Sequence, residues 1–180
     1  QGDPMIKVGL MGYGKAGQAV AEVLRSDPSF ELCWVVRRQA QAPDETVPGT
    51  TIPVVGLNQK VFPDWLDAHP VDALVDFSTP DAVFVYGEEV RKRQLMLVSA
   101  ISAYSESELD YVRLGGIVGH HEVIFGFPHQ TVRLIHDSIK REAFGTGAAF
   151  ALRQLSECAS GFYTFDDLLM RIARRQLAES

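Results

Sequence analysis

The chain has 180 residues, of which 46% are apolar and 22% charged, and its formal net charge is −6 at pH 7. Such a composition supports a packed core and excludes wholesale disorder. The acidic balance argues against a nucleic-acid-binding protein, which would normally present a basic face. We find no membrane-length apolar run and no signal peptide, so we expect a cytoplasmic protein that does not bind membranes. Residues 1–4 resemble a protease-site scar, and Met5 resembles the native start.

Strands and helices alternate over the first two thirds of the sequence. Short apolar runs rich in β-forming residues predict buried parallel strands at 6–11, 30–36, 52–55, 73–77 and 95–99. Helical patterns lie between them, at 15–25, 62–68 and 81–93, and a capping box at Ser105 and Glu108 predicts one more. This order predicts an α/β fold with a Rossmann-type, doubly wound parallel sheet, whose strand-to-helix turns share one ligand-binding edge.

The pattern changes near Gly115. Residues 117–125 and 131–138 are rich in β-formers, and the turn residues 126–130 between them predict a hairpin. Helices are expected over about 140–157 and from a Thr164–Asp167 capping pair to about residue 176. We therefore expect a dinucleotide-binding domain at 5–112 and a small, shortened α+β region at 113–180, which would serve substrate binding and oligomerisation.

A glycine-rich motif joins the first strand to the first helix. It reads G-x-G-x-x-G and consists of Gly12, Tyr13, Gly14, Lys15, Ala16 and Gly17. In this context the first glycine permits a tight turn, the second lets the backbone approach a pyrophosphate, and the third lets helix and strand pack closely. The N–H groups at the helix start then face the phosphate charge. The alternative is a glycine-rich turn without a ligand.

The strand ends beside this motif supply further candidate cofactor contacts. Arg37 and Arg38 stand where an acidic residue would bind the ribose 2′-hydroxyl of NAD, about 20 residues past the motif. Guanidinium groups suit a 2′-phosphate, so we predict NADPH, with NADH still possible; the alternative is a solvated basic pair. At the end of the fourth strand, Phe77 is expected near the ribose or nicotinamide. Ser78 and Thr79 would touch the cofactor or cap the next helix.

Several stretches resemble the dihydrodipicolinate reductase family of lysine biosynthesis. Residues 6–17 resemble its nucleotide loop, and 75–80 (V-D-F-S-T-P) its D-F-[ST]-x-P strand end. Residues 113–125 resemble its R-x-G-G-x-V-G-x-H-E-V strand, 138–147 the start of its following helix, and 161–169 its closing segment. The resemblance implies that the glycine loop binds the pyrophosphate, that Arg37 and Arg38 meet the adenosine ribose or its phosphate, and that Arg141 and Phe144 lie near the nicotinamide.

The chain departs from the family pattern in two places. The family's fifth strand ends in a G-T-T-G turn whose backbone contacts the nicotinamide; here Ser99 and Ala100 take that place and the glycines are gone. The family's H-H-x-x-K segment, which supplies the proton donor, a lysine and the substrate-carboxylate pocket, is absent. His120 and His121 are not that pair, because no lysine follows three residues on and neighbouring strand residues point to opposite faces.

The resemblance implies an NADPH-dependent reductase that transfers a hydride to the C=N bond of a cyclic imine similar to tetrahydrodipicolinate. Arg113 or Arg141 would hold a substrate carboxylate. No catalytic residue is assigned; the histidines at 120, 121, 129 and 136 are candidate proton donors because imidazole titrates near neutral pH. A metal site of His121, Glu122 and His136 is disfavoured, since nothing indicates convergent ligands.

Two other interpretations stay open. The protein is a non-catalytic NADPH-binding relative that has lost the catalytic segment, or the printed chain lacks residues that the natural protein has. By resemblance we also expect a homo-oligomer, a dimer or tetramer, because a hairpin and two helices form a thin layer with exposed edges.

Overall fold

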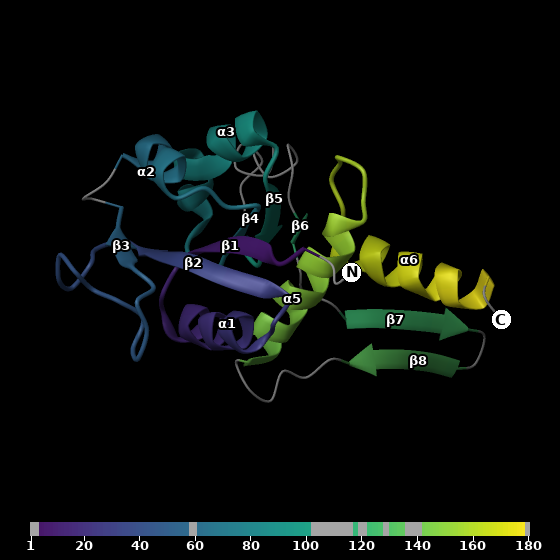
Figure 1. The fold of residues 1–180 in the computed structure, drawn as a ribbon. Coiled ribbons are helices and arrows are strands. Elements are labelled where there is room, and N and C mark those ends of the chain that lie inside the picture. The colour runs from purple at the N-terminus through teal and green to yellow at the C-terminus, as the bar shows by residue number, and fades with distance from the viewer. Residues whose placement is uncertain are drawn as a thin grey trace.

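The computed structural model of the chain describes residues 4–57, 61–101, 117–118, 122–127, 130–135 and 142–178, and it has an α/β architecture (Figure 1). Six parallel strands form one sheet in the order β3-β2-β1-β4-β5-β6. Their bounds are Ile6–Met11 (β1), Phe30–Arg37 (β2), Val54–Gly56 (β3), Ala73–Asp76 (β4), Met96–Ser99 (β5) and Ile117–Val118 (β6). This strand order is that of a dinucleotide-binding Rossmann sheet, which confirms the predicted fold class.

Helices cover both faces of the sheet (Figure 1). On one face, α1 (Lys15–Ser26) and α5 (Glu142–Ser156) bury Val20, Leu24 and Leu152 in one core cluster with β1 and β4. On the other face, α2 (Phe62–Ala68) and α3 (Val83–Arg93) bury their apolar sides in a second cluster around Trp34. Successive strand residues point to opposite faces, so the short apolar strands feed both clusters.

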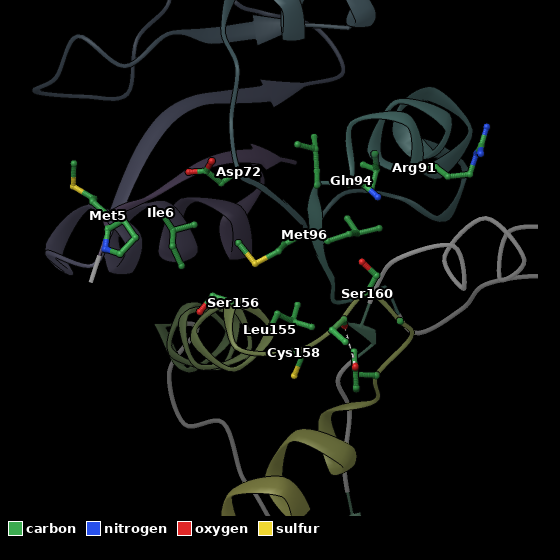
Figure 2. A pocket seen from close by; sticks show the side chains of 17 residues that line it. Met5, Ile6, Asp72, Arg91, Gln94, Met96, Leu155, Ser156, Cys158 and Ser160 are labelled. Carbon is green, nitrogen blue, oxygen red and sulfur yellow. Dashed lines mark hydrogen bonds between the residues drawn. The ribbon is translucent and has the colours of Figure 1, made fainter. Parts of the chain in front are cut away.

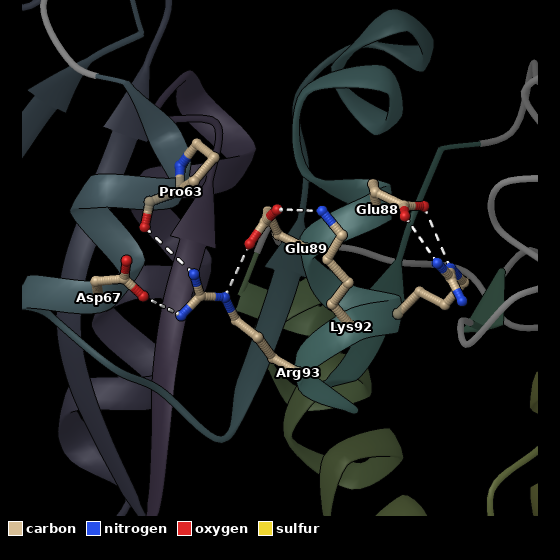
Figure 3. A network of polar contacts seen from close by, with 7 residues as sticks. Pro63, Asp67, Glu88, Glu89, Lys92 and Arg93 are labelled. Carbon is tan, nitrogen blue, oxygen red and sulfur yellow. Dashed lines mark hydrogen bonds and ion pairs between the residues drawn. The ribbon is translucent and has the colours of Figure 1, made fainter.

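A polar network fastens α2 to α3 at the surface (Figure 3). The Arg93 guanidinium lies 2.7 Å from the Asp67 carboxylate and 3.0 Å from that of Glu89, and it donates to the Pro63 carbonyl at 3.4 Å. Lys92 lies 3.3 Å from Glu89 on the same helix. Asp67 is exposed, and an exposed pair of this kind contributes about 0–1 kcal/mol. Glu89 is nearly buried, so its pairs with Arg93 and Lys92 supply the opposite charge that a buried carboxylate needs.

Small residues allow α5 to lie close against α1. A Cβ atom built on Gly145 would lie 2.7 Å from Val23 Cβ and 3.1 Å from Val20 Cα. Arg153 of α5 pairs with Asp27, just past the end of α1, and its guanidinium carbon stands 5.1 Å from the centre of the Phe30 ring. The core of the sheet therefore extends past residue 112. The division into regions 5–112 and 113–180 stays a prediction.

The predicted hairpin is present, but its bounds differ. Ile117 and Val118 pair parallel with β5 instead of opening the first arm. The β-forming pattern of residues 117–125 does not show which sheet each part of the run joins. The arms are β7 (Glu122–Phe127) and β8 (Gln130–Ile135), and Gly126, Phe127 and Gln130 belong to the ladder rather than to the loop. The helix expected after Ser105 lies outside the described residues.

The last helix, α6 (Phe165–Ala178), begins at the predicted capping box. The Thr164 N–H donates to the Asp167 carboxylate at 2.8 Å, and the Asp167 N–H donates to the Thr164 hydroxyl oxygen at 3.2 Å. These reciprocal bonds satisfy the first backbone donors and fix where the helix starts. In the described part of the chain, none of the helices is both long and apolar enough to cross a membrane.

The α1–α5 contact gives a matched pair of substitutions within one helix. Gly145→Ala places a methyl group against Val23, whereas Gly147→Ala meets nothing within 4 Å. Both changes remove a helical glycine, which alone stabilises by about 0.5–1 kcal/mol. We expect the Gly145 variant to be less stable than the Gly147 variant by roughly 1–3 kcal/mol in urea denaturation, because overpacking costs that much. Equal stability of the two variants would contradict the close packing.

Candidate cofactor site

The turn after β1 lies directly on the turn after β4. Gly12 has φ = +96°, and a Cβ atom built there would lie 2.6 Å from the Phe77 carbonyl oxygen and 2.8 Å from the Ser78 nitrogen. The Gly12 N–H donates to the Val36 carbonyl at 2.8 Å, and the Phe77 N–H donates to the Met11 carbonyl at 2.8 Å. Gly12 thus permits both the left-handed turn and the contact with the Phe77–Ser78 peptide.

The other two glycines of the motif have different surroundings. A Cβ atom on Gly17 would overlap the Gly12 carbonyl, so this glycine lets helix and turn pack together. Gly14 is exposed, has no atom within 4 Å of a built Cβ, and is the N-cap of α1 without a side-chain capping bond. The first turn of α1 carries no acidic residue. Its N–H groups are therefore open to an anion.

Arg37, the last residue of β2, and Arg38, which follows it, are not equivalent. Arg37 is partly buried and its guanidinium lies 2.8 Å from the Glu45 carboxylate, which also accepts the Gln41 N–H at 2.6 Å. Arg38 is exposed, forms no ion pair with the described residues, and stands close enough to Asp81 to help lower the pKa of that carboxyl, after a larger effect of the Thr79 hydroxyl. Unlike that of Arg37, the Arg38 guanidinium is therefore not neutralised by a paired carboxylate of the described residues.

That turn places Phe77, Ser78 and Thr79 at the carboxyl edge of the sheet. Thr79 stands at the N-cap of the 3₁₀ turn Pro80–Ala82 but makes no side-chain capping bond; its hydroxyl interacts with Asp81 instead. The Ser78 hydroxyl donates to the Asp76 carboxylate at 2.5 Å. Of the two residues proposed as caps, Thr79 thus holds the N-cap position, but it makes no side-chain capping bond there.

The carboxylate that accepts the Ser78 hydroxyl belongs to Asp76, a residue that the sequence analysis did not single out. Asp76, the last residue of β4, is fully buried and accepts hydrogen bonds from the Ser78 N–H at 2.8 Å and the Tyr86 hydroxyl at 2.5 Å. Burial raises the pKa of Asp76, and the hydrogen bonds from Ser78 and Tyr86 lower it in part. An aspartate that follows three apolar residues within a buried strand was the available signal.

The remaining predicted contacts come from β5 and α5. The Ala100 N–H donates to the Asp76 carbonyl at 3.0 Å, while Ser99 is buried and its hydroxyl oxygen stands 3.4 Å from the Ile101 nitrogen. Phe144, which is 45% exposed on the first turn of α5, meets Phe77 edge-on with ring centres 5.9 Å apart. Gly12 to Gly17, Phe77 and Phe144 thus lie along one edge. Arg141 lies outside the described residues.

The proposed proton donors and one of the two proposed carboxylate-binding arginines, Arg113, stay predictions. Arg113 and the histidines at 120, 121, 129 and 136 lie outside the described residues, so neither a proton donor nor a carboxylate-binding arginine is placed. Among the residues that the structure does place, no group of three metal-ligating side chains converges.

A hollow of the described surface lies at the other edge of the sheet (Figure 2). It has a volume of about 650 Å³ and opens where β1, β4 and β5 begin, between the end of α3 and the end of α5. Its walls include Ile6, Asp72, Met96 and Leu155. Parallel sheets of this type bind nucleotides at the carboxyl ends of the strands, so we assign the cofactor to the glycine turn and not to this hollow.

Two family models match the chain. The one described as "Dihydrodipicolinate reductase, N-terminus" matches residues 6–114, and "Dihydrodipicolinate reductase, C-terminus" matches residues 75–169. The 4-hydroxy-tetrahydrodipicolinate reductase of Thermosipho africanus is 39% identical over 64 residues, which are 36% of this chain and 30% of that protein. The enzyme of the same name from Caldanaerobacter subterraneus is 34% identical over 88 residues, 49% of this chain and 32% of that protein. The matches thus span less than a third of these relatives' length.

Solved structures share the fold at low identity. Dipicolinate-bound dihydrodipicolinate reductase from Paenisporosarcina sp. TG-14 superposes with a TM-score of 0.67 and 16% identity over 89% of this chain and 97% of that chain. An apo scyllo-inositol dehydrogenase from Lactobacillus casei gives a TM-score of 0.50 and 15% identity over 64% of this chain and 36% of that chain. At this identity the likeness concerns the fold alone.

The glycine turn gives a second matched pair. Gly12→Ala meets both a positive φ and the Phe77–Ser78 backbone, whereas Gly14→Ala meets nothing within 4 Å. We expect Gly12→Ala to lower the free energy of unfolding by at least about 1–3 kcal/mol, the cost of such backbone strain. Gly14→Ala should stay within about 0.5 kcal/mol of the wild type, as most surface changes do. Chemical denaturation checks both; a tolerated Gly12→Ala would show that the two turns do not touch.

Proposed function

The chain belongs to the dihydrodipicolinate reductase family, and from this we propose that it is an NADPH-dependent reductase that transfers a hydride to the C=N bond of a tetrahydrodipicolinate-like cyclic imine. One observation carries the proposal: a glycine turn at the carboxyl edge of a parallel sheet leaves the start of α1 open beside Gly14. The matches cover less than a third of the listed relatives' length, so the substrate and the turnover of this chain are part of the proposal.

The residues present suit a dinucleotide. The exposed backbone at Gly14 lets a pyrophosphate approach the first turn of α1, where free N–H groups and the positive end of the helix dipole stabilise its charge. Lys15 is exposed at the first helical position and adds a cation. Tyr13 packs against the core behind this turn, and burial is the main cause of the raised pKa of its phenol. The phenol is therefore neutral near pH 7.

We assign the preference for NADPH over NADH to Arg38. Glu45 and Arg37 neutralise each other, so Arg37 is less available to a ligand phosphate. Arg38 lies at the end of the strand that normally carries the ribose-binding residue, and a guanidinium holds a 2′-phosphate by charge-assisted hydrogen bonds. NADH would forgo these bonds and still bind through the glycine turn.

The nicotinamide end is assigned to Phe77 and Phe144, whose edge-on contact forms an apolar wall at the site. Such a wall excludes water and orients a flat ring. When bound, the cofactor would supply the hydride, and the protein supplies binding, orientation and electrostatics. Arg113 or Arg141 is assigned the substrate carboxylate, in keeping with the dipicolinate bound to the Paenisporosarcina enzyme. A cytoplasmic location and a dimeric or tetrameric assembly stay predictions.

Turnover tests the proposal directly. The purified chain is mixed with NADPH or NADH and a freshly generated dihydrodipicolinate-type imine, and the loss of absorbance of the reduced nicotinamide is followed. We expect oxidation that depends on the imine and is faster with NADPH. Gly14→Ala should lose that rate while it stays folded. Tight NADPH binding without turnover would contradict the reductase activity and favour a binding-only protein.

Cofactor preference gives a separate prediction. Arg38→Ala removes the proposed 2′-phosphate contact, so the Kd for NADPH should rise by about 10-fold or more, as expected for a hydrogen bond between charged groups. The Kd for NADH should change little. Arg91→Ala serves as the control, because Arg91 is an exposed arginine paired with Glu88 near the end of α3. An equal loss of affinity for NADPH and NADH would show that Arg38 does not bind the 2′-phosphate.

A further inference from the structure

We propose that Asp76 is the positioning residue of the cofactor site: its carboxylate holds the Phe77–Ser78 peptide in the orientation that the glycine turn requires. The inference rests on the proposed function, because it concerns the same dinucleotide site. Asp76 touches neither substrate nor cofactor in this scheme and acts through the turn that follows it.

Three donors converge on this carboxylate. One oxygen accepts the Ser78 N–H at 2.8 Å and the Ser78 hydroxyl at 2.5 Å, and the other accepts the Tyr86 hydroxyl at 2.5 Å. In the sheet, Asp76 lies between Met11 of β1 and Ser99 of β5, so it sits behind the edge where both neighbouring strands end. The carboxylate therefore ties the turn after β4 to the α3 helix that follows.

The free-energy cost of burying the Asp76 carboxylate indicates that this residue has a role beyond stability. Asp76 is 0% exposed, and no arginine or lysine of the described chain forms an ion pair with it. A buried carboxylate without a cation is expensive, and an apolar residue would suit the core of β4 better. What the aspartate supplies, and an apolar residue does not, is a pair of oxygen acceptors at the start of the turn.

The bonded peptide is the one that Gly12 contacts. Its carbonyl oxygen and nitrogen lie 2.6 Å and 2.8 Å from the position of a Gly12 Cβ, so a small rotation of this peptide would push into the glycine turn. The same peptide carries Phe77, whose ring meets Phe144. By holding this one peptide group, Asp76 thus fixes the glycine turn at the pyrophosphate end and the Phe77 ring at the nicotinamide end of the site.

The test compares Asp76→Asn with the wild type by titration with three probes: NADPH, NADH and adenosine 2′-monophosphate. Asparagine keeps the size but replaces one acceptor with an N–H₂ donor. We expect the Kd values for NADPH and NADH to rise together, by about tenfold, the effect of one charge-assisted hydrogen bond. Adenosine 2′-monophosphate, which reaches only the Arg38 end, should bind as it does to the wild type. A general loss of structure would weaken all three.

Tyr86→Phe is the second variant. It removes one donor and leaves both bonds from Ser78 in place, so the same pattern is expected with a smaller, several-fold change. If Asp76→Asn fails to fold, the titration of Tyr86→Phe with the same three probes tests the positioning role. Unchanged dinucleotide affinity in the folded variants, or an equal loss for all three probes, would overturn the positioning role. A wild type that binds neither dinucleotide would instead overturn the proposed function.

Discussion

The contact between two turns organises this edge of the molecule. After β1 the chain turns through Gly12, and the peptide between Phe77 and Ser78 occupies the space that a Gly12 side chain would need. That contact requires a glycine, brings the end of β4 beside the start of α1, and leaves Gly14 as the exposed corner. The open helix start, the placement of Phe77 and the role proposed for Asp76 all depend on it.

A second close contact completes the site from far along the sequence. Because Gly145 and its small neighbours let α5 lie against α1, the first turn of α5 reaches the carboxyl edge and Phe144 meets Phe77. Helices therefore cover both faces of the sheet, with α1 and α5 on one face and α2 and α3 on the other. The same packing explains why the core does not stop where the strand–helix alternation stops.

Much of the fold was predictable because it depends on local signals. Apolar runs identified the strands, and the Thr164–Asp167 capping box located the start of α6. Ile117 and Val118 pair with β5 and not with the hairpin arm that the pattern predicts, because β-forming residues alone do not show which neighbour a strand pairs with. Strand pairing depends on tertiary contacts, and a single sequence carries little information about them.

In the cofactor site, too, local features were predictable from the sequence, whereas contacts between distant residues were not. The glycine spacing predicted a turn, an open corner and a close packing point. It did not show that Glu45 pairs with Arg37, because that loop returns to β2 only in the folded chain. Nor did it connect Asp76 with Tyr86, which lie ten residues apart on a strand and a helix. A side chain whose partners come from another element is hard to assign before the elements are placed.

A crystal structure of the chain grown with NADPH would show whether the glycine turn after β1 holds the dinucleotide. We expect the pyrophosphate at the start of α1 beside Gly14, the 2′-phosphate on Arg38, and the nicotinamide end against Phe77 and Phe144. A nucleotide bound in the hollow at the opposite edge, or a glycine turn without nucleotide in crystals soaked well above its Kd, would contradict this expectation.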